Sequence, residues 1–146
     1  KTTHNNMKEV MTYETAYQEV SNFFGSLRKR LPSTTMAMED GYRKCAEAMQ
    51  YGYLTISGRE VTQVLIEPIL NNNGDVSLSE VKYSVPNVLE LQKTISASRV
   101  KRPNMSEWDI AVLAASKITG CLEAELDKLL SDDKNIMTYI VSFFLI

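Results

Sequence analysis

The C-terminal segment of residues 139–146 constrains the fold of this chain most, because it is apolar at nearly every position. A helix on the surface of a globular protein needs one apolar stripe, so a segment that is apolar all round must be covered on more than one face. A membrane span would need about 20 apolar residues, and the charges of Asp132, Asp133 and Lys134 end the stretch too early. A central core helix and a helix covered by a partner or a second subunit both remain open.

Further short helices are expected in the preceding part of the C-terminal region. Pro103 and Asn104 interrupt the chain, Ser106 and Asp109 have the spacing of an N-terminal capping pair, and Gly120 is placed to end the helix. Residues 131–133 offer capping oxygens for a later helix. Apolar residues at helical spacing indicate the second and third helices of this region: Leu122, Leu126, Leu129, Leu130, Ile136, Ile140, Phe143 and Phe144.

Two helices are expected in the N-terminal third of the chain. Apolar residues recur every three or four positions over residues 12–31, and Pro32 ends this pattern. A short connection with potential N-caps leads to a second apolar stripe: Met38, Tyr42, Cys45, Ala46 and Met49. The pattern predicts a helical hairpin, and its basic residues 28–30 are interpreted as a solvated helix end favoured by the helix dipole.

The centre of the chain has the composition of β-structure. Strand-forming residue types dominate after Gly52, and residues 71–75 form a strong turn signal in which Gly74 supplies a positive φ. We therefore expect an antiparallel hairpin of residues 64–70 and 76–83. Another short helix is expected near residues 88–95, before the basic side chains Arg99, Lys101 and Arg102, which are interpreted as a solvated loop.

These patterns together predict a single domain over residues 1–146, in the α+β class and mostly α. A flexible N-terminus of residues 1–11 precedes a helical pair of residues 12–51, a central antiparallel β-hairpin region of residues 52–85, and a helical region of residues 86–146 with three to four short helices. A chain of 146 residues with 44 % apolar and 23 % charged residues is typical of a globular domain with its own core.

Charge and cysteine content narrow the classes of function. A net charge of -2 gives no general attraction to nucleic acid or to anionic lipid, so neither is an expected partner. Cys45 and Cys121 lie at apolar positions far apart in sequence and are expected to be buried free thiols. The first residues lack the apolar core of a signal peptide, so we expect a cytoplasmic protein.

The sequence shows no pattern for catalysis, for a cofactor or for a metal, and we expect a protein that is not an enzyme. His4, in the polar N-terminus, is interpreted as solvated. Residues 69–80 fit a calcium-binding loop in part, but Ile69 stands where the first carboxylate belongs and Pro68 interrupts the entering helix, so a turn without metal is expected. Five acidic residues are interpreted as the solvated face of two helices: Glu123, Glu125, Asp127, Asp132 and Asp133.

Residues 63–146 resemble the small tail assembly chaperones of tailed bacteriophages, in particular those of Mu-like contractile-tailed phages. An apolar strand ending at Pro68, a turn at Gly74, a second strand and a helix start over residues 65–89 are similar to the opening of that family. Its helical end is matched by positions within residues 110–144: Ala114, Ile118, Thr119, Gly120, Leu126, Leu129, Asp133, Phe143 and Phe144.

The resemblance implies a non-enzymatic protein that binds the tape measure and tail tube proteins during assembly in the host cytoplasm. On this hypothesis, the face formed by Tyr139, Ile140, Phe143, Phe144 and Leu145 shields apolar surface of an unassembled partner. The alternative is a small helical adaptor or regulatory protein that homodimerises through its C-terminal helix. Both interpretations allow a homo-oligomer.

Overall fold

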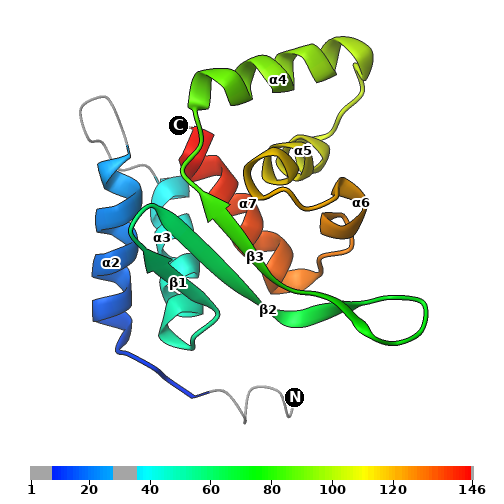
Figure 1. Ribbon diagram of the computed structural model, residues 1–146. Helices are drawn as coiled ribbons and strands as arrows, with labels where there is room; N and C mark the ends of the chain where they lie inside the picture. The colour runs from blue at the N-terminus through cyan, green and yellow to red at the C-terminus, as the bar shows by residue number, and fades with distance from the viewer. Residues whose placement is uncertain (1–7, 28–35, 146) are drawn as a thin grey trace.

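The computed structural model describes residues 8–27 and 36–145. Figure 1 shows the described elements along the chain, which begins with two helices, continues with three strands and ends with four helices. In order, these elements are α2 (Tyr13–Ser26), α3 (Met36–Gln50), β1 (Leu54–Ser57), β2 (Glu60–Leu70), β3 (Val76–Ser84), α4 (Val88–Lys101), α5 (Glu107–Thr119), α6 (Glu123–Leu126) and α7 (Ser131–Leu145). The predicted fold class, α+β and mostly α, is confirmed.

The predicted helical pair is present as α2 and α3. Thr12 is the N-cap of α2, where its side-chain oxygen accepts a hydrogen bond of 3.2 Å from the Thr15 backbone N–H. The helix ends at Ser26 with Leu27 as its C-cap, and the basic residues 28–30 lie outside the described residues, as does His4. The expected stripe of α3 is buried throughout: Met38, Tyr42, Cys45, Ala46 and Met49.

The three strands form one antiparallel sheet in the order β1-β2-β3. The predicted hairpin of β2 and β3 is confirmed, and Gly74 has the expected positive φ of 84°. The strand-forming residues before it add β1, which pairs with β2 through a turn at Gly58, so the hairpin becomes a three-stranded sheet. The inward face of this sheet is buried: Leu54, Val61, Gln63, Leu65, Val81 and Tyr83.

A large irregularity interrupts the pairing of β2 with β3. Val64 is paired with Glu80 and Ile69 with Leu78, so β2 contributes more residues than β3 between these pairs. Pro68 lies in this stretch and has no backbone N–H to donate. The backbone N–H groups of the bulge must therefore find partners outside the sheet.

Helix α5 has its predicted caps, but not all the C-terminal helices have their predicted lengths. Ser106 and Asp109 form a reciprocal capping box, and Gly120 ends α5 with φ 81°. The expected leucine helix is only the four-residue α6, because Leu126 and Leu129 are buried while Leu122 and Leu130 face solvent. The expectation of a basic loop at residues 99–102 is wrong, since α4 continues through Lys101 and its last turn carries two of these cations.

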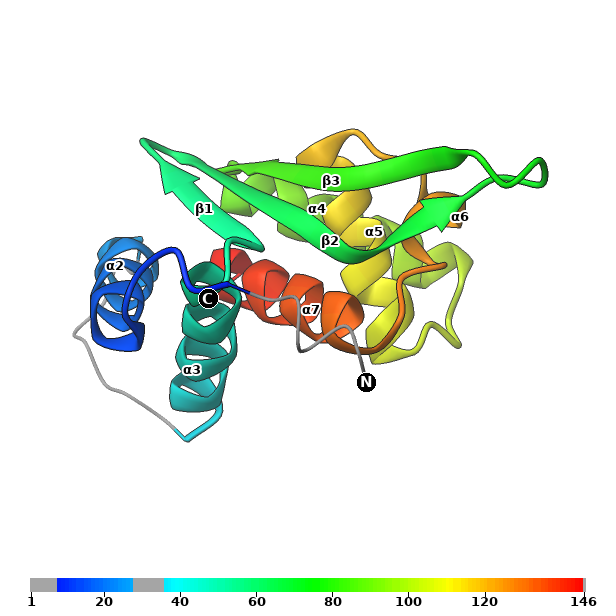
Figure 2. The ribbon, with the colours of Figure 1, turned by 90° about the horizontal axis from the view of Figure 1, so that it is seen from below.

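The helices lie on one face of the sheet, and α7 runs across the middle of that layer (Figure 2). Its buried side chains contact the N-terminal helical pair, the sheet and α5, so they connect the parts of the molecule. The core-helix interpretation of the apolar C-terminal segment is therefore the one that the fold shows for α7: Ile136, Met137, Ile140, Val141, Phe143 and Phe144 are all buried.

Candidate functional site

The structure places the predicted partner-binding residues mainly inside the core. Ile140, Phe143 and Phe144 are 0 %, 5 % and 2 % exposed, and Tyr139 and Leu145 are partly buried. The ring of Phe143 lies 4.6 Å from that of Phe24 and 5.0 Å from that of Tyr42. We therefore correct the expectation of an exposed face, because the folded chain needs three of its five side chains to fill the space between α2, α3 and the sheet.

An apolar groove lies at the C-terminal end of α7, and the buried Phe144 contributes to its lining. It has a volume of about 740 Å³ and lies between the end of α2, the turn after β1, the connection from β3 to α4 and the end of α7. A smaller hollow of about 420 Å³ lies elsewhere on the molecule. We call the larger one the Phe144 groove, and it is lined by Ser26, Leu27, Arg59, Val85, Pro86, Asn87, Val88, Leu89 and Phe144. The groove thus contains one of the five predicted residues, together with apolar residues that the sequence did not single out.

The connection from β3 to α4 explains why apolar side chains line this groove. The Val85 backbone N–H donates a 3.1 Å hydrogen bond to the Arg59 carbonyl, which extends the strand pairing to the end of the sheet. Pro86 disfavours a helical conformation at Val85, and Asn87 then caps α4 by accepting a hydrogen bond from the Glu90 backbone N–H at 3.1 Å. Leu89 consequently lies in the first turn of α4, where it is 70 % exposed.

Asp133 connects the first turn of α7 to the bulge in β2. Its two carboxylate oxygens accept hydrogen bonds from the backbone N–H groups of Ile66 and Glu67, each at 2.9 Å. These are the N–H groups that the irregular pairing leaves without partners in the sheet. Asp133 is 1 % exposed, so its expected place on a solvated acidic face is wrong.

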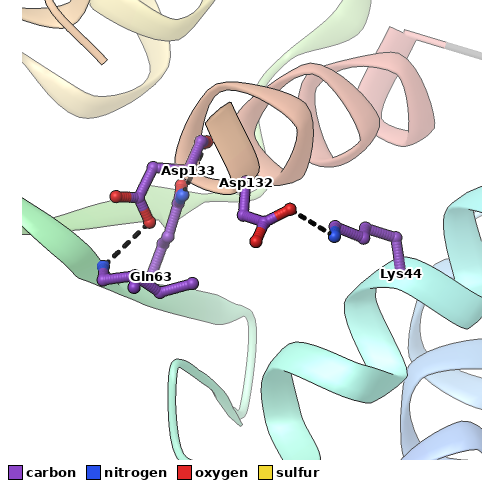
Figure 3. Close-up of polar contacts among 5 residues, drawn as sticks. Lys44, Gln63, Asp132 and Asp133 are labelled. Atoms are coloured by element: carbon purple, nitrogen blue, oxygen red, sulfur yellow. Dashed lines mark hydrogen bonds and ion pairs between the residues drawn. The ribbon is translucent and has the colours of Figure 1, made fainter. Parts of the chain in front are cut away.

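A buried polar chain continues from the backbone of Asp133 into the sheet. The Gln63 side-chain amide donates to the Asp133 carbonyl at 2.9 Å (Figure 3). The Tyr83 hydroxyl in turn donates to the Gln63 side-chain oxygen at 2.7 Å. Burial raises the pKa of Tyr83 well above its ordinary value, which keeps the phenol protonated as a donor. Burial also raises the pKa of Asp133, and its two backbone hydrogen bonds act in the opposite direction.

The neighbouring Asp132 points away from this chain, towards α3, as Figure 3 shows. It forms an ion pair of 2.6 Å with Lys44 at the edge of the smaller hollow, which Tyr51, Tyr53 and Ile136 also line. This ion pair links the first turn of α7 to α3 across the edge of the hollow. Cys45 lies nearby in α3, but burial raises the pKa of its thiol to about 12, so it is a poor nucleophile.

The described residues contain no group of three or more His, Cys, Asp or Glu side chains that could hold a metal ion. The partial calcium template of residues 69–80 forms the hairpin turn instead. The side-chain oxygen of Asn71 accepts hydrogen bonds from the backbone N–H groups of Asn73 and Asp75, so it organises the turn.

Within the part of the chain that the structure describes, no helix combines the length and the apolar character that crossing a membrane requires.

Sequence reasoning missed both the Phe144 groove and the role of Asp133. The groove joins residues from several separate segments, and Pro86-Asn87 followed by the apolar pair Val88 and Leu89 was its one local signal. Asp133 had the pattern of a helix start, and nothing local indicates that its oxygens face β2.

Comparisons of the chain with protein-family models, with curated proteins and with solved structures each find no match.

Proposed function

We propose that this chain is a non-enzymatic protein-binding module that acts as a phage tail assembly chaperone and binds a tape measure or tail tube protein. The proposal rests on the resemblance of residues 63–146 to that family, and the Phe144 groove is the observation in its favour. A groove rimmed by an exposed leucine and lined by apolar residues suits an apolar segment of another protein.

The lining of the groove also favours one chemistry for that segment. Among the described residues that line it, Arg59 alone is charged. The occupant we propose is an apolar segment with a carboxylate at its edge, which would pair with Arg59 and fix the orientation. Each well-buried apolar anchor would contribute roughly 1.5–3 kcal/mol, before the cost of association is subtracted.

This assignment replaces the face first expected on α7. Ile140, Phe143 and Phe144 are buried in the core, so the contact surface we propose is the groove and not α7 itself. A partner could reach the groove without any rearrangement of α7, because Leu89 stands on its rim in the folded chain.

A pair of leucine substitutions tests the proposal. Leu89 and Leu122 are 70 % and 69 % exposed, but Leu89 belongs to the groove and Leu122 precedes α6. We expect the wild-type chain and Leu122→Asp to bind purified tape measure or tail tube protein equally well in titration calorimetry. Leu89→Asp should weaken binding at least about tenfold, a loss of about 1.4 kcal/mol.

Circular dichroism of both variants checks that each remains folded. Failure of the wild-type chain to bind either tail protein would refute the chaperone assignment. Equal binding by Leu89→Asp and Leu122→Asp would instead refute the groove as the contact surface.

A further inference from the structure

The far end of the β2–β3 hairpin projects from the body of the molecule beyond the covering helices, as Figures 1 and 2 show. We call residues 67–80 the arm. Leu70 and Val76 are partners in the strand register near its tip, and they are 54 % and 58 % exposed. Such a pair on a projecting hairpin is apolar surface that the fold itself leaves uncovered.

The arm is also acidic. Glu67, Asp75 and Glu80 are exposed, and residues 67–80 include no lysine or arginine. Lys82, the nearest cation along β3, lies 3.8 Å from Glu80, and both of these side chains are about half exposed. An exposed pair of this kind is weak and can exchange partners at little cost.

The C-terminal end of α4 carries basic side chains, in contrast to the acidic arm. Val100 is 83 % exposed and is flanked by Arg99, Lys101 and Arg102, which are exposed too. We call residues 99–102 the basic end. Arg102 lies 3.7 Å from Glu123 in a half-exposed pair, and the negative end of the α4 dipole favours these cations where they stand.

The arm and the basic end complement each other in charge, and each has an apolar centre. They stand at separate corners of the molecule in both ribbon views, so they are not in contact within one chain (Figures 1 and 2). We propose that the arm of one copy docks on the basic end of a second copy. Leu70 and Val76 would cover Val100, while the carboxylates of the arm would face the cations of the basic end.

Two general considerations support this contact. The net charge of -2 is small, so repulsion between whole molecules does not oppose association. The contact uses different surfaces on the two copies, so it can close into a ring or a reciprocal pair, or it can continue into a longer assembly. Opposite charges at its edge would set the register, and the apolar centre would supply most of the affinity.

Sedimentation velocity of the purified full chain tests the contact without any tail protein, so its result is independent of the proposed function. At about 0.1 M salt the average mass should rise with concentration above the 16.5 kDa of one chain. About 1 M salt should reduce association, because the Debye length falls from about 10 Å to about 3 Å. A chain that stays monomeric at every concentration in low salt would overturn the proposal.

A valine pair separates the arm from other exposed apolar surface. Val76 and Val10 are 58 % and 63 % exposed, and Val10 lies before α2, outside the arm and the basic end. Val76→Ser should raise the dissociation constant at least about tenfold, whereas Val10→Ser should associate like the wild type. Equal effects of the two substitutions would overturn the assignment of the arm.

Charge reversal provides the sharpest test. One variant carries Glu67→Lys and Glu80→Lys, which makes its arm and its basic end both basic; the other carries Arg99→Glu and Lys101→Glu, which makes both acidic. Each variant alone should be monomeric, and a 1:1 mixture should associate, since each arm then meets an end of opposite charge. A mixture that stays monomeric while the wild type associates would contradict the proposed contact, and circular dichroism would confirm that both variants are folded.

Discussion

Asp133 is the residue that does most to fix the relation between α7 and the sheet. Its carboxylate completes the hydrogen bonding of a bulge that the sheet cannot complete itself. It also sits in the first turn of α7, where the positive end of the helix dipole favours a negative charge. The side chain therefore acts as a connector between two elements that are distant in sequence.

Replacing Asp133 by Asn should destabilise the fold by about 1–3 kcal/mol. The amide keeps one acceptor oxygen but turns its NH₂ group towards the other backbone N–H, which is left without a partner. Asp132→Asn is the matched control, because its ion pair with Lys44 is partly exposed and should contribute about 0–1 kcal/mol. Urea unfolding of the two variants gives the comparison, and equal losses would show that the bulge does not depend on Asp133.

Gly41 is a second position where one added carbon atom would change the stability of the fold. A Cβ atom at Gly41 would lie 2.6 Å from Cζ of Phe143 and 2.9 Å from Cδ1 of Tyr139, so α3 approaches α7 closely there. Gly41→Ala should therefore lose stability on the order of 1 kcal/mol, since overpacking of about 1–3 kcal/mol exceeds the gain in helix propensity. Gly25→Ala in α2 meets nothing within 4 Å and should gain about 0.5 kcal/mol. Thermal unfolding should thus show shifts of opposite sign.

At the scale of elements, α7 is the helix on which the packing of the others depends. Phe143→Ala should cost about 3–5 kcal/mol and lower the unfolding midpoint strongly, because its ring lies against those of Phe24 and Tyr42. Ser142→Ala on the exposed side of the same helix should stay within about 0.5 kcal/mol of the wild type. A stable Phe143→Ala variant would restore the idea of a docking face on α7.

The elements could be predicted from sequence wherever the signal was local. The capping pair of Ser106 and Asp109, the stop at Gly120 and the turn at Gly74 each depend on a few neighbouring residues, and all three are present. The leucine pattern around α6 misled because spacing alone does not say which positions are covered, and Leu122 and Leu130 are not.

The candidate site was harder to predict because it depends on contacts between distant segments. The apolar run of residues 139–146 was recognised, but the burial of Phe143 depends on Phe24 and Tyr42, which both lie more than a hundred positions earlier in the sequence. The Phe144 groove likewise exists only when the end of α2, the turn after β1, the connection from β3 to α4 and the end of α7 come together. No window of sequence contains that arrangement.

For the whole molecule, the decisive feature is that one core extends from the N-terminal helical pair to the C-terminal helices. Buried residues of α2, α3, the sheet, α5 and α7 belong to the same cluster. The ring of Phe24 in α2 contacts those of Phe143 and Phe144, and α7 in turn packs on α5. We therefore expect the chain to unfold as one cooperative unit, as the sequence-based prediction of a single domain requires.

A substitution in α2 observed through a probe in α5 tests this expectation. Trp108, the single tryptophan of the chain, is in α5, where its ring N–H donates to Asp127 at 2.7 Å and its fluorescence reports the C-terminal region. Phe24→Ala should shift the Trp108 fluorescence transition and the far-UV circular dichroism transition together, by about 3–5 kcal/mol, because the cavity weakens the shared core. Asn22→Ala, at an exposed position of the same helix, should leave both within about 0.5 kcal/mol of the wild type. If Phe24→Ala left the Trp108 transition in place while part of the helical signal melted earlier, α2 and α3 would form a separate unit and the chain would have two cores.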